Sequence, residues 1–289
     1  MPEVEADTGV RTTPKPAEET LLSVERAFAM VEVLSDASEG RSLAELAREF
    51  AINKAIAQRL LDTLEAIGIV WRDDLRQRWH LTYKISNLGL RQLQKGGLLD
   101  QCAATLKSLA SATGELVRLA VVEHGEKITW VYAIAGVRRS VQIDPNYSLE
   151  IQLNTHAIAK AWLATMPFDE ALRLIERQGA VALTRYSHVN VEELRADHAA
   201  TAARGFAISF EEQELGVGAI AAPVIVTELD ETRRCVGAVS LAAPTSRMNR
   251  AELEACAPAL LATVAHLAET WPLADTPRPS ALGAVPQTR

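Results

Sequence analysis

Amide and cationic side chains gather near two predicted turns in the first third of the sequence. Gln58 follows a predicted helix start at Asn53, and a glutamine can bond to the edge of adenine. Lys54, in the first turn of the same helix, suits guanine or a phosphate. Such side chains at the start of a helix indicate contacts to DNA bases and phosphates. The candidate DNA-binding residues, including those of a predicted hairpin, are Ser42, Asn53, Lys54, Gln58, Arg59, Arg72, Arg76 and Arg78.

A second group of polar residues lies in the middle of the chain. Asn154, Thr155 and His156 stand where a predicted loop meets a helix start, and free backbone amides at that place favour an anion. His156 is a candidate donor to a carboxylate, although a capping pair beside a structural histidine explains the same residues equally well. Trp130 could form the wall of an aromatic ligand site, or simply pack on a sheet.

Other residue patterns do not favour an enzyme, a metal site or a cofactor. Glu211 and Glu212 resemble an acid–base pair, but the polar residues around them favour a solvated loop. The glycines at 216 and 218 lack the third glycine of a dinucleotide fingerprint. Three widely spaced cysteines make a disulfide framework or a zinc cluster improbable and favour a reducing cytoplasm.

The composition is that of a globular protein with about two domains in 289 residues. A net charge of −7 argues against binding nucleic acid by bulk charge. The charge is uneven, however, because residues 41–91 hold nine Lys and Arg against six Asp and Glu, a net +3. No apolar run approaches the length of a membrane span, and residues 1–20 do not resemble a signal peptide.

Hydrophobic periodicity in the first part of the chain predicts three helices followed by a hairpin. The helices are expected at 22–36, 43–50 and 53–67, and the hairpin strands at 69–71 and 78–81. Ser42 and Glu45 form a capping-box pattern at the start of the second helix. This order is typical of a winged helix-turn-helix, and a generic small helical domain with a hairpin is the alternative.

The remainder of the sequence predicts linker helices and then an α+β domain with a largely antiparallel sheet. Strands are expected at 116–123, 127–134, 140–143, 206–210, 219–226 and 235–242. Helices are expected at 155–164, 169–178, 191–204 and 250–270. The predicted division is a disordered tail (1–20), a winged helix-turn-helix domain (21–84), a linker helix (85–111), an α+β domain (112–271) and a second disordered tail (272–289).

An ordered set of sequence blocks along residues 21–271 resembles the IclR family of bacterial transcription regulators. In the first part these blocks are SVERA (23–27), SLAELA (42–47), RLLDTL (59–64) and GIV (68–70). In the second part they are LNTHAIAKAWLA (153–164), RGF (204–206), EE (211–212), GVGAIAAPV (216–224) and GAVSL (237–241).

The resemblance implies a winged helix, a linker helix used in dimerisation and a GAF-like domain that binds a small, usually carboxylated metabolite. Family members act as dimers or tetramers on palindromic operators and repress or activate transcription. The resemblance places the strands of Ser209 and Ser240 around the ligand pocket and singles out Ala219. The full predicted effector-binding set is therefore Trp130, Asn154, Thr155, His156, Ser209, Ala219 and Ser240. The sequence departs from the family pattern at Ala55–Ala57, where hydroxyl side chains are usual, at Ala159, where glycine is usual, and at Ala219, where cysteine is frequent.

These expectations combine into a cytoplasmic, ligand-responsive DNA-binding regulator without a cofactor or a membrane partner. The predicted partners are a double-stranded operator, a small carboxylated effector of aromatic or aliphatic type, and further copies of the chain. The alternative is a small-molecule-binding or enzymatic α+β protein whose helical N-terminal domain serves only dimerisation.

Overall fold

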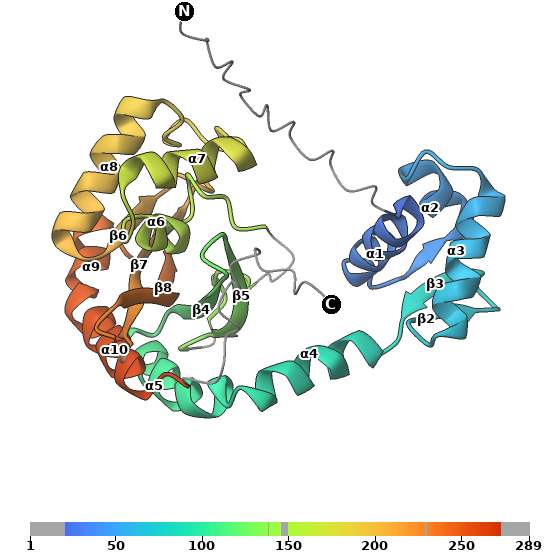
Figure 1. Cartoon of the computed structure of the whole chain (residues 1–289), viewed down its shortest axis with the longest axis horizontal. Coiled ribbons are helices and arrows are strands. Elements are labelled where there is room, and N and C mark those ends of the chain that lie inside the picture. Colours follow the sequence, from blue (N-terminus) through green and yellow to red (C-terminus); the bar gives the residue numbers. More distant parts are fainter. Residues whose placement is uncertain (1–20, 138, 146–149, 229, 273–289) are drawn as a thin grey trace, which may run out of the picture. The chain divides into compact units, whose positions relative to one another are not determined.

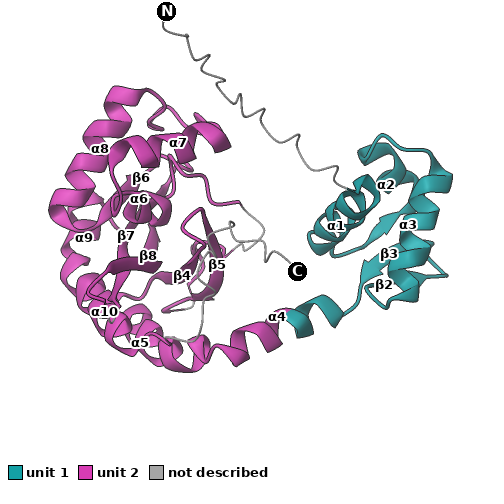
Figure 2. Ribbon diagram, viewed as in Figure 1, with its two compact units in different colours: residues 1–88 teal, residues 89–289 magenta. Residues whose placement is uncertain are grey.

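The computed structural model describes residues 21–272 except 138, 146–149 and 229, and these residues form two compact units (Figures 1 and 2). The units divide between Leu88 and Gly89. Both predicted tails lie outside the described residues, apart from residue 272.

The N-terminal unit contains a helical group and a three-stranded antiparallel sheet of strand order β1-β3-β2. Its elements are α1 (Leu22–Ser35), β1 (Arg41–Ser42), α2 (Leu43–Glu49), α3 (Lys54–Ala66), β2 (Val70–Asp73) and β3 (Arg78–Leu81). Met30, Leu46, Leu61 and Trp79 are almost fully buried in the centre of this unit. The winged helix predicted from the sequence is confirmed, with the two-residue strand β1 as an addition that the sequence did not predict.

Two helices follow the winged helix, α4 (Lys84–Lys95) and α5 (Leu98–Thr113). They are interrupted where predicted, because Gly97 adopts a left-handed φ of 63° that a residue with a Cβ rarely tolerates. One face of α5 buries Cys102, Leu106 and Leu109 in the core of the C-terminal unit. Helix α5 is therefore an integral part of that unit.

The C-terminal unit is built on a five-stranded antiparallel sheet of order β5-β4-β8-β7-β6. The strands are β4 (Leu116–Glu123), β5 (Lys127–Ile134), β6 (Ala207–Phe210), β7 (Val217–Thr227) and β8 (Arg233–Pro244). The helices are α6 (Ala157–Leu163), α7 (Phe168–Gln178), α8 (Val191–Arg204), α9 (Arg250–Ala255) and α10 (Ala257–Thr270). A core cluster with α5 and α10 lies on one face of the sheet, and a second cluster with α6, α7 and α8 lies on the other (Figure 1).

Two details of the predicted C-terminal unit need correction. The strand expected at 140–143 is absent, and these residues have no regular structure. Val141 is 60% exposed, so the apolar alternation of this stretch does not mark a buried face. The helix expected at 250–270 divides at Cys256 into α9 and α10.

By length and composition, the stretch Arg250–Thr270 is apolar enough to cross a membrane, which the sequence analysis did not expect. In the structure Leu253, Leu260 and Leu267 are completely buried beside the sheet. This is the pattern of an amphipathic stretch that packs one face against the sheet.

Candidate nucleic-acid interface and ligand cavity

Helix α3 presents its polar residues on the side opposite its buried stripe. Ala57, Leu61 and Leu64 point into the core, whereas Lys54 is exposed and Gln58 is partly exposed. The Gln58 amide donates to the Asp62 carboxylate one turn later, at 2.6 Å. This bond is solvent-accessible, so Gln58 is free to exchange it for a base edge.

Two of the predicted DNA-binding residues are engaged in helix caps. Ser42 Oγ accepts the Glu45 amide at 3.3 Å, and the Glu45 carboxylate accepts the Ser42 amide at 2.7 Å. These bonds hold the pKa of Glu45 below its ordinary value. Asn53 Oδ1 accepts the Ile56 amide at 2.8 Å. Both side chains set the helix starts, as the capping patterns predict.

The three arginines of the predicted wing have different environments. Arg78 bonds to the backbone oxygens of Glu39 and Gly40 and pairs with Glu45 at 3.2 Å, so it joins the hairpin to the start of α2. Arg72 and Arg76 are exposed, and the 3.3 Å pair of Arg76 with Glu39 is open to solvent. An exposed pair of this kind is weak and easily exchanged for a phosphate.

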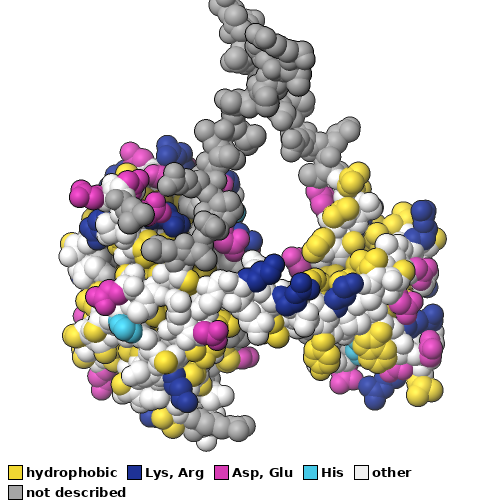
Figure 3. Space-filling model, turned by 60° about the horizontal axis from the view of Figure 1, so that its bottom comes forward, with side chains coloured by type: hydrophobic (Ala, Val, Ile, Leu, Met, Phe, Trp, Pro, Cys, Tyr) yellow, Lys and Arg dark blue, Asp and Glu magenta, His cyan; other side chains and the backbone are white. Residues whose placement is uncertain are grey.

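An apolar groove of about 640 Å³ lies on the N-terminal unit beside α3. Its lining comes mainly from α1 and α3, with two residues from the start of α4. Phe28 lines the groove and is 64% exposed. The side chain of Arg59 also borders the groove. Figure 3 shows hydrophobic side chains at the surface of this unit, on the right. The other apolar lining residues exposed by more than a third are Val24, Ile56, Ile67 and Leu88.

A cavity of about 340 Å³ lies in the C-terminal unit on the α6 face of the sheet. Ser209, Ala219 and Ala242 stand opposite one another on β6, β7 and β8 and line one wall. The two alanines leave space that larger side chains would fill. Arg118 of β4 and His156, which precedes α6, line the cavity as well.

The environment of His156 keeps its imidazole neutral. The ring is largely desolvated and close to the Arg118 guanidinium, and these causes lower its pKa to about 4. Nδ1 accepts the Gln152 amide at 3.0 Å, so the ring proton resides on Nε2. His156 therefore offers the cavity a neutral N–H donor.

Arg118 is a cavity residue that the sequence analysis missed. Its guanidinium lies 4.8 Å from the centre of the Trp130 ring, which also meets the His156 ring edge-on at 6.3 Å between ring centres. Trp130 thus contacts both polar residues, although it does not line the cavity itself. A cation within an otherwise apolar strand, Leu116 to Val122, was the available signal.

The other predicted effector residues, Asn154, Thr155 and Ser240, do not line this cavity. Asn154 donates to the backbone oxygens of Val181 and His188, at 3.0 and 2.9 Å, and so holds a distant loop. The amides of Thr155 and His156 both donate to Gln152 O, so they are not free for an anion. Thr155 and Ser240 are buried outside the cavity lining, and Ser240 stands opposite Arg118 on the neighbouring strand.

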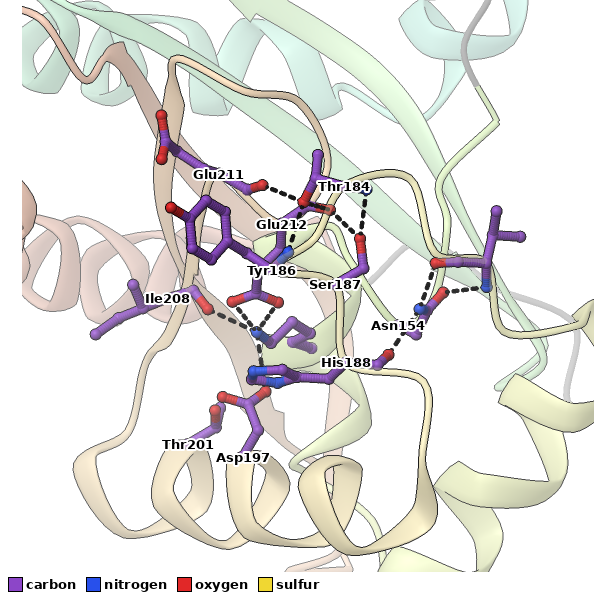
Figure 4. A network of polar contacts seen from close by, with 12 residues as sticks. Asn154, Thr184, Tyr186, Ser187, His188, Asp197, Thr201, Ile208, Glu211 and Glu212 are labelled. Atoms are coloured by element: carbon purple, nitrogen blue, oxygen red, sulfur yellow. Dashed lines mark hydrogen bonds and ion pairs between the residues drawn. The ribbon is translucent and has the colours of Figure 1, made fainter.

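The prediction of a solvated loop at 211–212 is wrong for Glu212. It is 5% exposed and accepts two bonds from Lys160 Nζ, at 2.9 and 2.7 Å. Lys160 also pairs with Asp197 at 2.9 Å and donates to Ile208 O at 2.7 Å (Figure 4). This group, which we term the Lys160 triad (Lys160, Asp197 and Glu212), joins α6, α8 and the end of β6. Its carboxylates serve packing rather than acid–base catalysis.

The lowered pKa of His156 predicts that stability depends on pH. Below pH 6.5 an unfolded histidine binds a proton, whereas the folded His156 stays neutral until about pH 4. The unfolded state therefore binds more protons, and stability falls as the pH falls through this window. Between pH 7 and 4 the parent protein should lose about 3 kcal/mol of unfolding free energy because of His156, and His156→Gln should remove this loss. Hydrogen exchange of α6 peptides in both proteins measures it, and equal pH dependence would contradict the assignment.

The winged helix and a separate ligand cavity together define a ligand-responsive transcription regulator. Two family models match the chain, an IclR helix-turn-helix domain over residues 23–74 and the bacterial transcriptional regulator IclR C-terminal domain over residues 90–269. The chain belongs to the IclR family.

Individual relatives agree with this assignment. The chain is similar to the transcriptional repressor IclR of Escherichia coli K12, with 25% identity over 81% of this chain and 84% of the relative. The regulator KdgR of the same organism is 25% identical over 82% of this chain and 87% of its own length. These relatives are regulators rather than enzymes, which removes the enzymatic alternative.

Solved structures show the same fold. An IclR transcriptional regulator from Alicyclobacillus acidocaldarius superposes with a TM-score of 0.73 at 23% identity, covering 86% of this chain and 98% of that one. An IclR homologue from Microbacterium hydrocarbonoxydans complexed with 4-hydroxybenzoate gives a TM-score of 0.67 at 17% identity, covering 85% and 98%.

Proposed function

We propose that this regulator binds a palindromic operator as a homodimer or homotetramer in the cytoplasm, and that a small carboxylate in the C-terminal cavity controls it. The observation that carries the proposal is the pairing of an exposed polar row on α3 with an apolar groove beside it. A second copy would cover the groove, because apolar surface of this extent is seldom left to water. Two-fold symmetry would then match a palindrome.

The proposed DNA contacts come from α3 and the hairpin. Lys54 and Gln58 face the major groove in this proposal, and Arg59 meets the DNA backbone from the border of the apolar groove. Arg72 and Arg76 meet the backbone or minor groove. Ser42, Asn53 and Arg78 contribute by fixing the backbone of the helix starts and the hairpin. Since α3 carries alanine and isoleucine where relatives have hydroxyl side chains, phosphate binding depends more on the cations.

Gln58→Ala should weaken specific operator binding about 10-fold, because a bidentate base contact contributes roughly 1–3 kcal/mol. Binding to unrelated DNA should stay the same, since that binding comes from phosphate contacts. Titration of the operator and of a scrambled duplex at one salt concentration measures both quantities. Glu65→Gln, also exposed on α3, is the matched control and should bind the operator like the parent protein. Unchanged affinity in Gln58→Ala would refute this placement of α3.

The proposed effector is a small carboxylate, and aromatic acids are included because a homologue is complexed with 4-hydroxybenzoate. The cavity supports this class with Arg118, His156 and Ser209 on a floor of small residues. The ligand regulates DNA binding only if it binds two arrangements of the protein with different affinity.

A gel-shift experiment with DNA upstream of the regulator's own gene tests the proposed function. We expect a discrete shifted band that a stabilising carboxylate strengthens or weakens. A thermal-shift screen of aromatic and aliphatic carboxylates identifies that ligand. Absence of any discrete shift with operator-length DNA would contradict the proposal.

A further inference from the structure

The donors of the C-terminal cavity are concentrated around one cluster. Arg118, Trp130 and His156 come from β4, β5 and the start of α6, and the indole lies against both partners. The Trp130 Nε1 atom is buried and has no hydrogen-bond partner among the described residues. Ser209, 4% exposed, adds a hydroxyl on the adjoining sheet wall. Of these residues Arg118, His156 and Ser209 line the cavity, and they offer it one cation and two neutral donors.

We propose that Arg118 is the carboxylate-binding residue of this cavity, and that the Nε2–H of His156 binds a second, neutral oxygen of the same ligand. The inference rests on the proposed function and deepens it. It specifies the ligand class as a monocarboxylate that carries a hydroxyl, carbonyl or ether oxygen.

The geometry of Arg118 suits this role. A guanidinium binds a carboxylate along its N–H edge in a bidentate manner. Its face, in contrast, stacks on an aromatic ring. The contact with Trp130 therefore orients Arg118 through its face, and the strand β4 on which it stands is paired on both sides.

The charges around the cavity limit the ligand to one carboxylate. Among the described residues of the lining, the titratable side chains besides Arg118 and His156 are Asp144 and Glu214, which are exposed. Both are acidic, so a second carboxylate on the ligand would meet repulsion. The neutral imidazole adds no positive charge to offset it.

Matched probes test the ligand class. We would use a hydroxybenzoate with benzoate, 3-hydroxybutanoate with butanoate, the primary amide of each acid, and succinate, all at millimolar concentration. A hydroxylated acid should stabilise the full-length protein to heat, and its amide, its deoxy partner and succinate should do so much less. Equal stabilisation by acid and amide, or no stabilisation by any hydroxylated acid, would overturn the proposal.

Variants of the cluster assign the roles by calorimetry with the stabilising acid. Arg118→Met should weaken binding at least 30-fold and Arg118→Lys less, because lysine keeps the charge but not the fork. His156→Gln keeps an N–H donor and should lose only a few-fold. Arg177→Met, an exposed arginine paired with Glu126, is the matched control and should bind normally. Unchanged affinity in a folded Arg118→Met protein would refute the assignment.

The pH dependence separates Arg118 from His156 as the anchoring cation. With Arg118 as the anchor, affinity should be constant between pH 5.5 and 8, because Arg118 stays charged and His156 stays neutral. A fall in affinity of up to about 10-fold per pH unit across this range would instead identify a protonated histidine as the anchor and overturn the proposal. Operator shifts with the same preparations distinguish the outcomes. If only the ligand assignment is wrong, the protein still shifts operator DNA. If the proposed regulatory function is wrong, no operator shift is seen.

Discussion

Lys160→Met should lower the unfolding free energy of the C-terminal unit by about 3–5 kcal/mol, the usual cost of removing one partner from a buried ion pair. Lys160 is 6% exposed and holds Asp197 and Glu212 at 2.9 and 2.7 Å. Without the ammonium, two carboxylates would face each other in the interior. Burial already raises the pKa of Glu212, and Lys160 is the main influence that lowers it.

The penalty in Lys160→Met should depend on pH in a defined direction. A carboxyl group whose pKa is raised by folding favours the folded state below its unfolded pKa of about 4.5 and opposes it as the pH rises through the raised value. The variant should therefore be least destabilised in mild acid. Adding Glu212→Gln to Lys160→Met should recover part of the loss near neutral pH.

Hydrogen exchange of peptides from α6 and β7 measures these differences in the full chain. Arg250→Met is the matched control, because its pair with Glu254 is exposed and contributes at most about 1 kcal/mol. A Lys160→Met protein as stable as the control at pH 8 would contradict the assigned role of the triad.

Phe28→Asp should abolish dimerisation through the groove and weaken binding to the full palindrome by more than about 100-fold. Phe28 is 64% exposed in the apolar groove, so aspartate is tolerated in the free monomer but not in a covered interface. A dimer binds the palindrome more tightly than a monomer does, because once one copy is bound the second copy is at a high effective concentration near its half-site. Monomers lose this advantage.

Analytical ultracentrifugation gives the oligomeric state of Phe28→Asp, and titration of full and half operators gives the affinities. The loss should appear for the palindrome and be small for a single half-site. Leu75→Asp, which places the same side chain at a 97% exposed position outside the groove lining, should sediment like the parent protein. A Phe28→Asp protein that remains a dimer would show that the copies associate elsewhere.

Local patterns were the predictable part of the fold. The capping box of Ser42 and Glu45 and the cap at Asn53 were visible because their partners are three residues apart. The alternating and helical periodicities likewise placed most elements. The strand expected at 140–143 failed because alternation alone cannot show that a sheet edge is available beside it.

The cavity was less predictable because its contacts join distant positions. Asn154 has the residue type of a ligand donor, but its partners, Val181 and His188, lie 27 and 34 positions away. Arg118 has the residue type of a surface cation, and only the register with β8 places it on the inward face. Glu212 looked solvated until Lys160, 52 positions earlier, was found beside it.

The central position of β8 determines when the C-terminal sheet can form during synthesis. Since β8 lies between β4 and β7, the sheet stays in two halves until residue 244 has been made. The winged helix needs only the chain up to Leu88. At about 5–20 residues per second, the ribosome would carry a folded winged helix for about 8–30 s before the sheet can close. A message truncated between codons 88 and 244 would yield a winged helix attached to a C-terminal unit that cannot complete its sheet.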